Sequence, residues 1–126
     1  MVRHHYLTHH QNNPDKIEKV AQIDHWYMEQ FAWFLQEMDR TQDVDGHSLL
    51  HNSMLVIGCA NADGNRHTHD NLPIVLAGGG GGTLTAGRYV RFNSLPMCNL
   101  YLSMLDRMGV RGVERFGDST GRLEGL

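Results

Sequence analysis

The sequence MLVIGCANADGNRHTHDNLPIVLAGGGGG, residues 54–82, decides the fold that we expect. It contains two apolar runs, residues 54–60 and 72–77, and polar or glycine-rich sequence bounds each of them. A short apolar run bounded in this way predicts a strand that is buried on both faces, as in a parallel sheet covered by helices. Pro73 suits the first residue of a strand but not its middle, so we place the second strand at residues 74–77.

Helices are predicted on both sides of these strands. Asn13, Pro14 and Asp15 supply an N-cap, a first helical residue and an acid in the first turn, so we expect a helix over about residues 14–40. Its apolar residues recur at spacings of three and four. Asp24 interrupts this apolar stripe, and we expect it either to satisfy a polar contact or to support a nearby site. A last helix, about residues 95–108, should end at Gly109.

The composition excludes several classes of protein. The chain has 126 residues, which is enough for one domain, and its net charge of −3 comes with 11 scattered lysines and arginines. A nucleic-acid-binding surface is therefore not expected. No apolar run approaches the roughly 20 residues that cross a bilayer, so we expect no membrane span. The first ten residues also lack the apolar core of a secretory signal.

Histidine is the one residue type in clear excess, and two short segments hold six of the nine. In HHYLTHH, residues 4–10, His5 and His9 are four apart, so on a helical turn they project from one side and can bind one divalent ion. His4 and His10 can join them, support them by hydrogen bonds or face solvent. The alternative is a surface cluster of histidines without a bound metal.

The second histidine segment follows the first predicted strand. Residues 61–70, NADGNRHTHD, lie where the carboxyl end of that strand would be, which is where sites form in open α/β sheets. Asp63 is the natural carboxylate ligand. His67 and His69 would project to one face of an extended segment, with Asp70 as an orienting carboxylate. The alternative is a polar turn at Asp63 and the glycine that follows it.

A resemblance adds to this interpretation. The strings HHYLTHH, SLLHNSMLVIGCANADGNRHTHDNLPIVLAGGGGG and FGDSTGRLEGL closely resemble the C-terminal part of a bacterial family called domain of unknown function 1552, whose HHxxSHH motif has Thr8 here at the serine position. That family in turn resembles the alkaline phosphatase and sulfatase superfamily. The resemblance implies an α/β fold: a partial α/β sandwich of alkaline-phosphatase-like type, in which a few mostly parallel strands are flanked by helices.

The resemblance also implies roles for residues. By position, His5 and His9 are similar to the superfamily's first ligand pair, residues 61–63 to the second ligand location, and His67 or His69 to its last histidine. Asn61-Ala62-Asp63 departs from the usual Asp-His, which argues against a full two-metal site. The superfamily's nucleophile belongs to an N-terminal half, so we expect residues 1–126 to be the C-terminal part of a single, truncated domain.

These expectations lead to two hypotheses of function. In the first, the chain belongs to a hydrolase of small phosphate or sulfate esters that uses Zn, Mn, Ca or Fe. In the second, it is a non-enzymatic metal- or ligand-binding protein that keeps the fold. The resemblance implies a periplasmic or extracellular location for either. No GxSxG nucleophile motif is present, and the hydroxyls closest in sequence to the histidines are Thr8 and Thr68.

Overall fold

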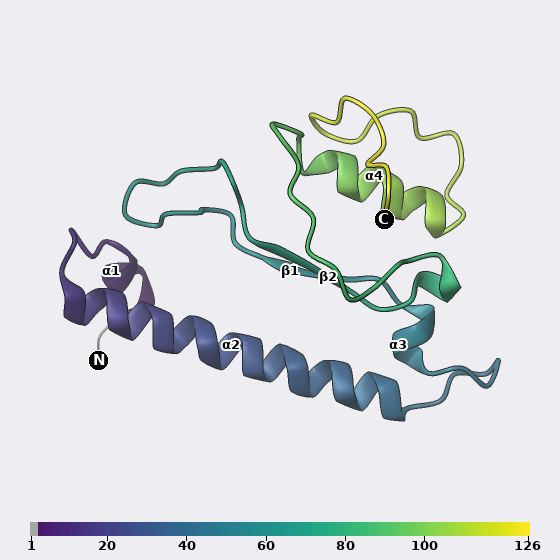
Figure 1. The fold of residues 1–126 in the computed structure, drawn as a ribbon, viewed down its shortest axis with the longest axis horizontal. Helices are drawn as coiled ribbons and strands as arrows, with labels where there is room; N and C mark the ends of the chain where they lie inside the picture. Colours follow the sequence, from purple (N-terminus) through teal and green to yellow (C-terminus); the bar gives the residue numbers. More distant parts are fainter. Residues whose placement is uncertain (1–2) are drawn as a thin grey trace. The chain divides into compact units, whose positions relative to one another are not determined.

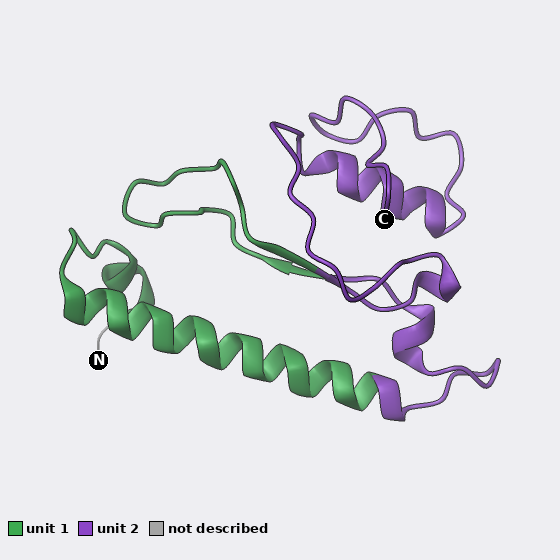
Figure 2. Cartoon of the chain, viewed as in Figure 1, with its two compact units in different colours: residues 1–38, 56–75 green, residues 39–55, 76–126 purple. Residues whose placement is uncertain are grey.

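The computed structural model describes residues 3–126 (Figure 1). In chain order its elements are α1 (His4–Thr8), α2 (Pro14–Arg40), α3 (Leu49–Asn52), β1 (Leu55–Gly58), β2 (Ile74–Ala77), the 3₁₀ turn η1 (Gly80–Gly82) and α4 (Cys98–Arg107). The chain divides into two compact units (Figure 2). Unit 1 comprises residues 1–38 and 56–75, and unit 2 comprises residues 39–55 and 76–126.

The strands form at the predicted places but pair in the opposite sense. β1 and β2 make a two-stranded antiparallel sheet, so the prediction of an α/β sandwich with mostly parallel strands is wrong. Parallel strands need a long crossover, usually a helix. The described residues 59–73 contain no helix, and bonds between Ala62, Asp63 and Thr68 fold this connection back on itself. Residues 55–57 of β1 are half-buried and Gly58 is exposed, so the strand is not covered on both faces.

Unit 1 begins with two helices whose junction is tied by local contacts. The Asn13 side chain accepts a hydrogen bond from the backbone N–H of Lys16 at 3.1 Å, which confirms the predicted N-cap of α2. The Lys16 ammonium lies 3.8 Å from the centre of the Tyr6 ring and donates to the carbonyl oxygen of His9 at 3.3 Å. These contacts fix the end of α1 against the first turn of α2.

Most of α2 is open to solvent. None of its residues is buried, and the apolar side chains of Trp26 and Trp33 are 53% and 59% exposed. Among residues 3–126, no helix is long and apolar enough to cross a membrane, as the sequence predicts.

Unit 2 is organised around α4. Leu100, Leu102 and Leu123 supply its buried apolar side chains. The helix ends at Gly109 as predicted, and Gly109 has a φ of 76°. The N–H of Gly109 donates to the carbonyl oxygen of Asp106, and the N–H of Val110 donates to the carbonyl oxygen of Leu105. This double bond pattern is a Schellman motif, which requires the left-handed conformation that glycine adopts most easily.

The glycine run after β2 packs closely against α3. The N–H of Gly79 donates to the carbonyl of Leu50 at 3.0 Å, and a Cβ on Gly79 would lie 2.6 Å from the carbonyl oxygen of His51. Real Cβ atoms do not come so close, so a glycine is required at this position. Gly79 therefore serves backbone packing.

Candidate functional site

Three of the predicted histidine ligands come together in unit 1. His5 is the second residue of α1 and His9 is its C-cap, and their ring centroids are 4.6 Å apart. The His9 ring lies 4.9 Å from the ring of His67, which comes from the loop of residues 59–73. Both pairs meet edge to face, at 84° and 81°. We call His5, His9 and His67 the imidazole cluster.

Close backbone approaches hold the loop against α1. The N–H of Gln11 donates to the side-chain oxygen of Asn65 at 3.0 Å. A Cβ on Gly64 would lie 2.9 Å from the Cβ of Thr8, so only a glycine allows this approach. His67 has a φ of 54°, in the left-handed region that few non-glycine residues adopt and in which asparagine, aspartate and histidine are the most frequent of them. This backbone conformation accompanies the placement of its ring beside His9.

Asp63 faces His10 rather than the imidazole cluster. Its Oδ1 accepts hydrogen bonds from the N–H groups of Asn65 at 2.8 Å and Arg66 at 3.4 Å, which is the Asx turn given above as the alternative. The same oxygen lies 3.8 Å from Nε2 of His10, and the Asp63 Oδ2 lies 3.7 Å from Nε of Arg66. Asp63 and His10 therefore form a separate pair beside the cluster.

The remaining predicted residues lie apart from the imidazole cluster. Nδ1 of His69 is 2.8 Å from the carbonyl oxygen of Ala60, so this nitrogen is used within the loop. His4 and Asp70 are exposed, and within residues 3–126 neither makes a hydrogen bond or ion pair with the cluster. Of the predicted set, the structure therefore joins His5, His9 and His67, and separately His10 and Asp63.

The electrostatics of the cluster favour neutral imidazole at its centre. Partial desolvation lowers the pKa of His9 from its ordinary value, and the charges of His5, His67 and Lys16 lower it further. A histidine must be neutral to bind a metal. The environment of His9 thus favours the protonation state that a metal ligand needs.

The ligand type and spacing fit a metal, although the rings are not yet in a binding arrangement. Two imidazoles on one ion, with Zn–N bonds of about 2.1 Å, have ring centroids roughly 5 Å apart, close to the separations seen here. Within residues 3–126, however, no group of three or more His, Cys, Asp or Glu side chains is arranged to hold an ion. Binding would require the side chains to rearrange so that a ring nitrogen of each points at one centre.

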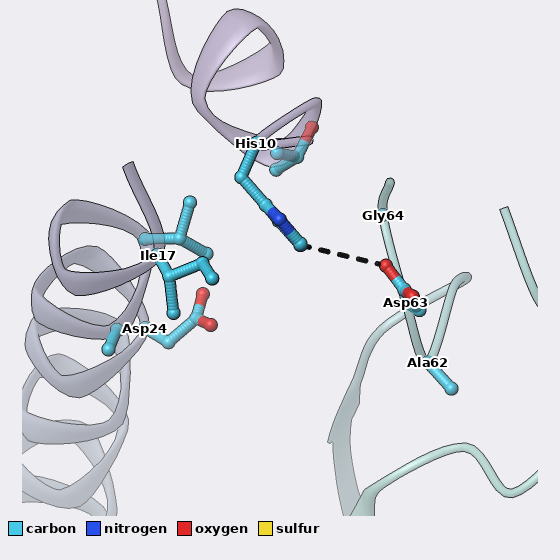
Figure 3. A pocket seen from close by; sticks show the side chains of 9 residues that line it. His10, Ile17, Asp24, Ala62, Asp63 and Gly64 are labelled. Atoms are coloured by element: carbon cyan, nitrogen blue, oxygen red, sulfur yellow. Dashed lines mark ion pairs between the residues drawn. The ribbon is translucent and has the colours of Figure 1, made fainter. Parts of the chain in front are cut away.

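A pocket of about 320 Å³ adjoins the His10–Asp63 pair (Figure 3). We call it the α2–loop pocket; its lining residues are Thr8, His10, Ile17, Val20, Ala21, Asp24, Ala62, Asp63 and Gly64. Ile17, Val20 and Ala21 belong to the apolar stripe predicted for the helix over residues 14–40, and the sequence did not predict a pocket beside them. The one signal was the carboxylate of Asp24 within that apolar stripe.

The histidines of unit 2 form another contact that sequence reasoning did not single out. The rings of His47 and His51 stack with centroids 4.3 Å apart and planes 24° apart. Their spacing of four residues is the same as that of His5 and His9, which meet edge to face instead.

Comparison of the whole chain with protein-family models, curated proteins and solved structures finds no match.

Proposed function

We propose that His5, His9 and His67 hold a divalent metal ion and that the chain forms part of a hydrolase of phosphate or sulfate esters. One observation carries this proposal: the His9 ring lies within 5 Å of both the His5 and the His67 ring. Two histidine segments far apart in the sequence thereby share one centre. The ester as substrate comes from the resemblance described above.

The backbone of His67 supports a role beyond folding. A non-glycine residue in the left-handed region costs roughly 1–2 kcal/mol, and an asparagine would be accommodated there more easily. Such costs concentrate at functional sites, where the surrounding structure maintains them. This conformation places the His67 ring beside that of His9.

The chemistry of the site divides between the metal and the protein. A bound ion would polarise an ester oxygen and activate a nucleophile. The imidazole cluster would hold that ion, and His10, oriented by Asp63, can hold or release a proton at Nε2. Because the Thr8 hydroxyl donates to the carbonyl of His5 at 2.9 Å, it is used within α1.

That use of Thr8 favours a second candidate function, metal binding without catalysis. Thr8 would have to leave its hydrogen bond before it could attack an ester, and the Thr68 hydroxyl oxygen already accepts a hydrogen bond from the N–H of Asp63. A binding protein with the same three histidines needs no such hydroxyl. Metal affinity and ester turnover must therefore be measured separately.

Calorimetric titration of tag-free protein with Zn²⁺, Mn²⁺, Ca²⁺ and Fe²⁺ tests the metal site. We expect His9→Ala to weaken binding at least tenfold, because it removes the central ligand. His67→Asn should weaken binding to a similar degree while leaving the protein at least as stable, since asparagine tolerates the left-handed conformation. His25→Ala, on the exposed part of α2, is the matched control. Unchanged affinity in both cluster variants would reject the site.

Hydrolysis of p-nitrophenyl phosphate and p-nitrophenyl sulfate tests the enzyme hypothesis. The protein for this assay is the longest chain that carries these 126 residues, loaded with the metal that binds most tightly. Turnover that disappears with His9→Ala supports the hydrolase. Tight metal binding without turnover of either ester favours the binding protein instead.

A further inference from the structure

The α2–loop pocket has an apolar wall and a polar rim. Ile17, Val20 and Ala21 from the first turns of α2 form the wall, and Ala62 and Gly64 face them from the loop. Its volume of about 320 Å³ lies at the small end of the range of ligand pockets, roughly 300–1,000 Å³. The wall therefore suits a short hydrocarbon group.

Two carboxylates border this apolar surface. Asp24 lies one helical turn beyond Ala21, and its side chain extends toward the space between α2 and the loop (Figure 3). In residues 3–126, Asp24 has no hydrogen bond or ion pair. Asp63, on the other side, is already engaged by His10 and Arg66. Asp24 is thus the acceptor that remains available to a ligand.

The apolar wall together with the two carboxylates favours a positively charged ligand. A phosphate, sulfate or carboxylate would face two negative groups, whereas a cation would be attracted to both. A hydrated metal ion would gain little from the apolar wall. A ligand with a positive head and a short hydrocarbon body uses all three features.

We propose that the α2–loop pocket binds a small organic cation of the alkylammonium class. The ammonium group donates a hydrogen bond to Asp24, and the hydrocarbon chain packs on Ile17 and Val20. The Asp63 carboxylate adds a second, weaker attraction because His10 and Arg66 partly neutralise it. This proposal does not depend on the metal site, since none of the residues that line the pocket belongs to the imidazole cluster.

Titration of ¹⁵N-labelled protein with n-butylammonium chloride, followed by amide chemical shifts, tests the proposal. We expect saturable shifts at the amides of Ala21, Ala62 and Gly64. Butanol has the hydrocarbon body without the charge, butyrate has the opposite charge, and Mg²⁺ has charge without the body. Each should bind at least fivefold more weakly. Binding of any of the three as tight as that of butylammonium would overturn the proposal.

Two variants assign the interaction to its residues. Asp24→Asn should weaken butylammonium binding about two- to fivefold, the effect of losing one exposed charge. Asp15→Asn, on the first turn of the same helix and outside the pocket, should leave the affinity unchanged. An unchanged affinity in Asp24→Asn, or shifts that fall elsewhere in the spectrum, would reject the pocket. The His9→Ala protein should still bind butylammonium, which separates this result from failure of the metal site.

Discussion

Gly64 is the residue at which the loop comes closest to α1, and its replacement tests how tightly the site is packed. A methyl group there would press against Thr8, so Gly64→Ala should destabilise the protein by about 1–3 kcal/mol, as overpacking does. Gly121→Ala is the matched control, because a Cβ on Gly121 has open space around it and φ is not left-handed. Its effect should stay within about 0.5 kcal/mol in urea unfolding. Equal effects of the two variants would contradict the close packing.

The Asp106 carboxylate makes the free energy of unfolding depend on pH in the acidic range. Arg122 donates two hydrogen bonds to it, at 2.7 and 3.1 Å, and these lower the pKa of Asp106 below its ordinary value. The resulting stabilisation is present above the unfolded pKa of about 3.9 and is lost as the pH falls through the folded-state pKa. The free energy of unfolding of Asp106→Asn should therefore fall less than that of the wild type between about pH 5 and pH 2. An identical fall in both proteins would show that the pair is not formed.

At the scale of single elements, the sequence predicted the start of α2 and the end of α4, because both depend on local interactions. Asn13 caps α2 and Gly109 ends α4 because each signal acts within one helical turn. The start of α4 was placed about three residues too early. The N–H groups of Asn99 and Leu100 bond to carbonyls three residues back, so a tight turn precedes the α-helix. Pro96 also disfavours a helical conformation at the residue before it.

The packing of α4 depends on one buried hydroxyl. Ser103 donates to the carbonyl of Leu123 at 3.2 Å and accepts from the N–H of the same residue at 2.7 Å. Ser103→Ala would leave both backbone groups buried without a partner, so we expect a loss of about 1–3 kcal/mol in the free energy of unfolding. Ser94→Ala, at an exposed position, serves as the control. A loss under about 0.5 kcal/mol at Ser103 would mean that water replaces the hydroxyl.

At the scale of the whole molecule, the sequence predicted where the strands form but not the direction in which they pair. Apolar runs reveal where strands form, whereas the direction of pairing depends on how the connection folds. The four-residue spacing predicted that His5 and His9 meet. That His67 joins them while His69 bonds to Ala60 follows from the turn made by Asp63 and Thr68. Such loop geometry has no periodic signal in sequence.

The exposed surface of α2 is a second departure from the expected fold. An amphipathic helix gains most of its stability by packing its apolar face, and a helix with apolar residues on several sides is usually buried. In α2, Phe31 belongs to the predicted apolar stripe, while Trp26 and Trp33, seven residues apart, lie on the opposite side. The two tryptophans are the only ones in the sequence, so their fluorescence reports on this helix alone.

We expect both tryptophans to emit at the wavelength of tryptophan in water and to be quenched freely by acrylamide, because each is more than half exposed. Trp26→Phe and Trp33→Phe separate the two signals. The tryptophan that remains in each variant should show the same emission wavelength and the same quenching by acrylamide. The measurement is made at concentrations where sedimentation shows a monomer. Blue-shifted, protected emission under those conditions would mean that part of this chain covers α2. A blue shift that grows with concentration would instead mean that a second copy of the chain covers the helix, since association is the step that dilution reverses.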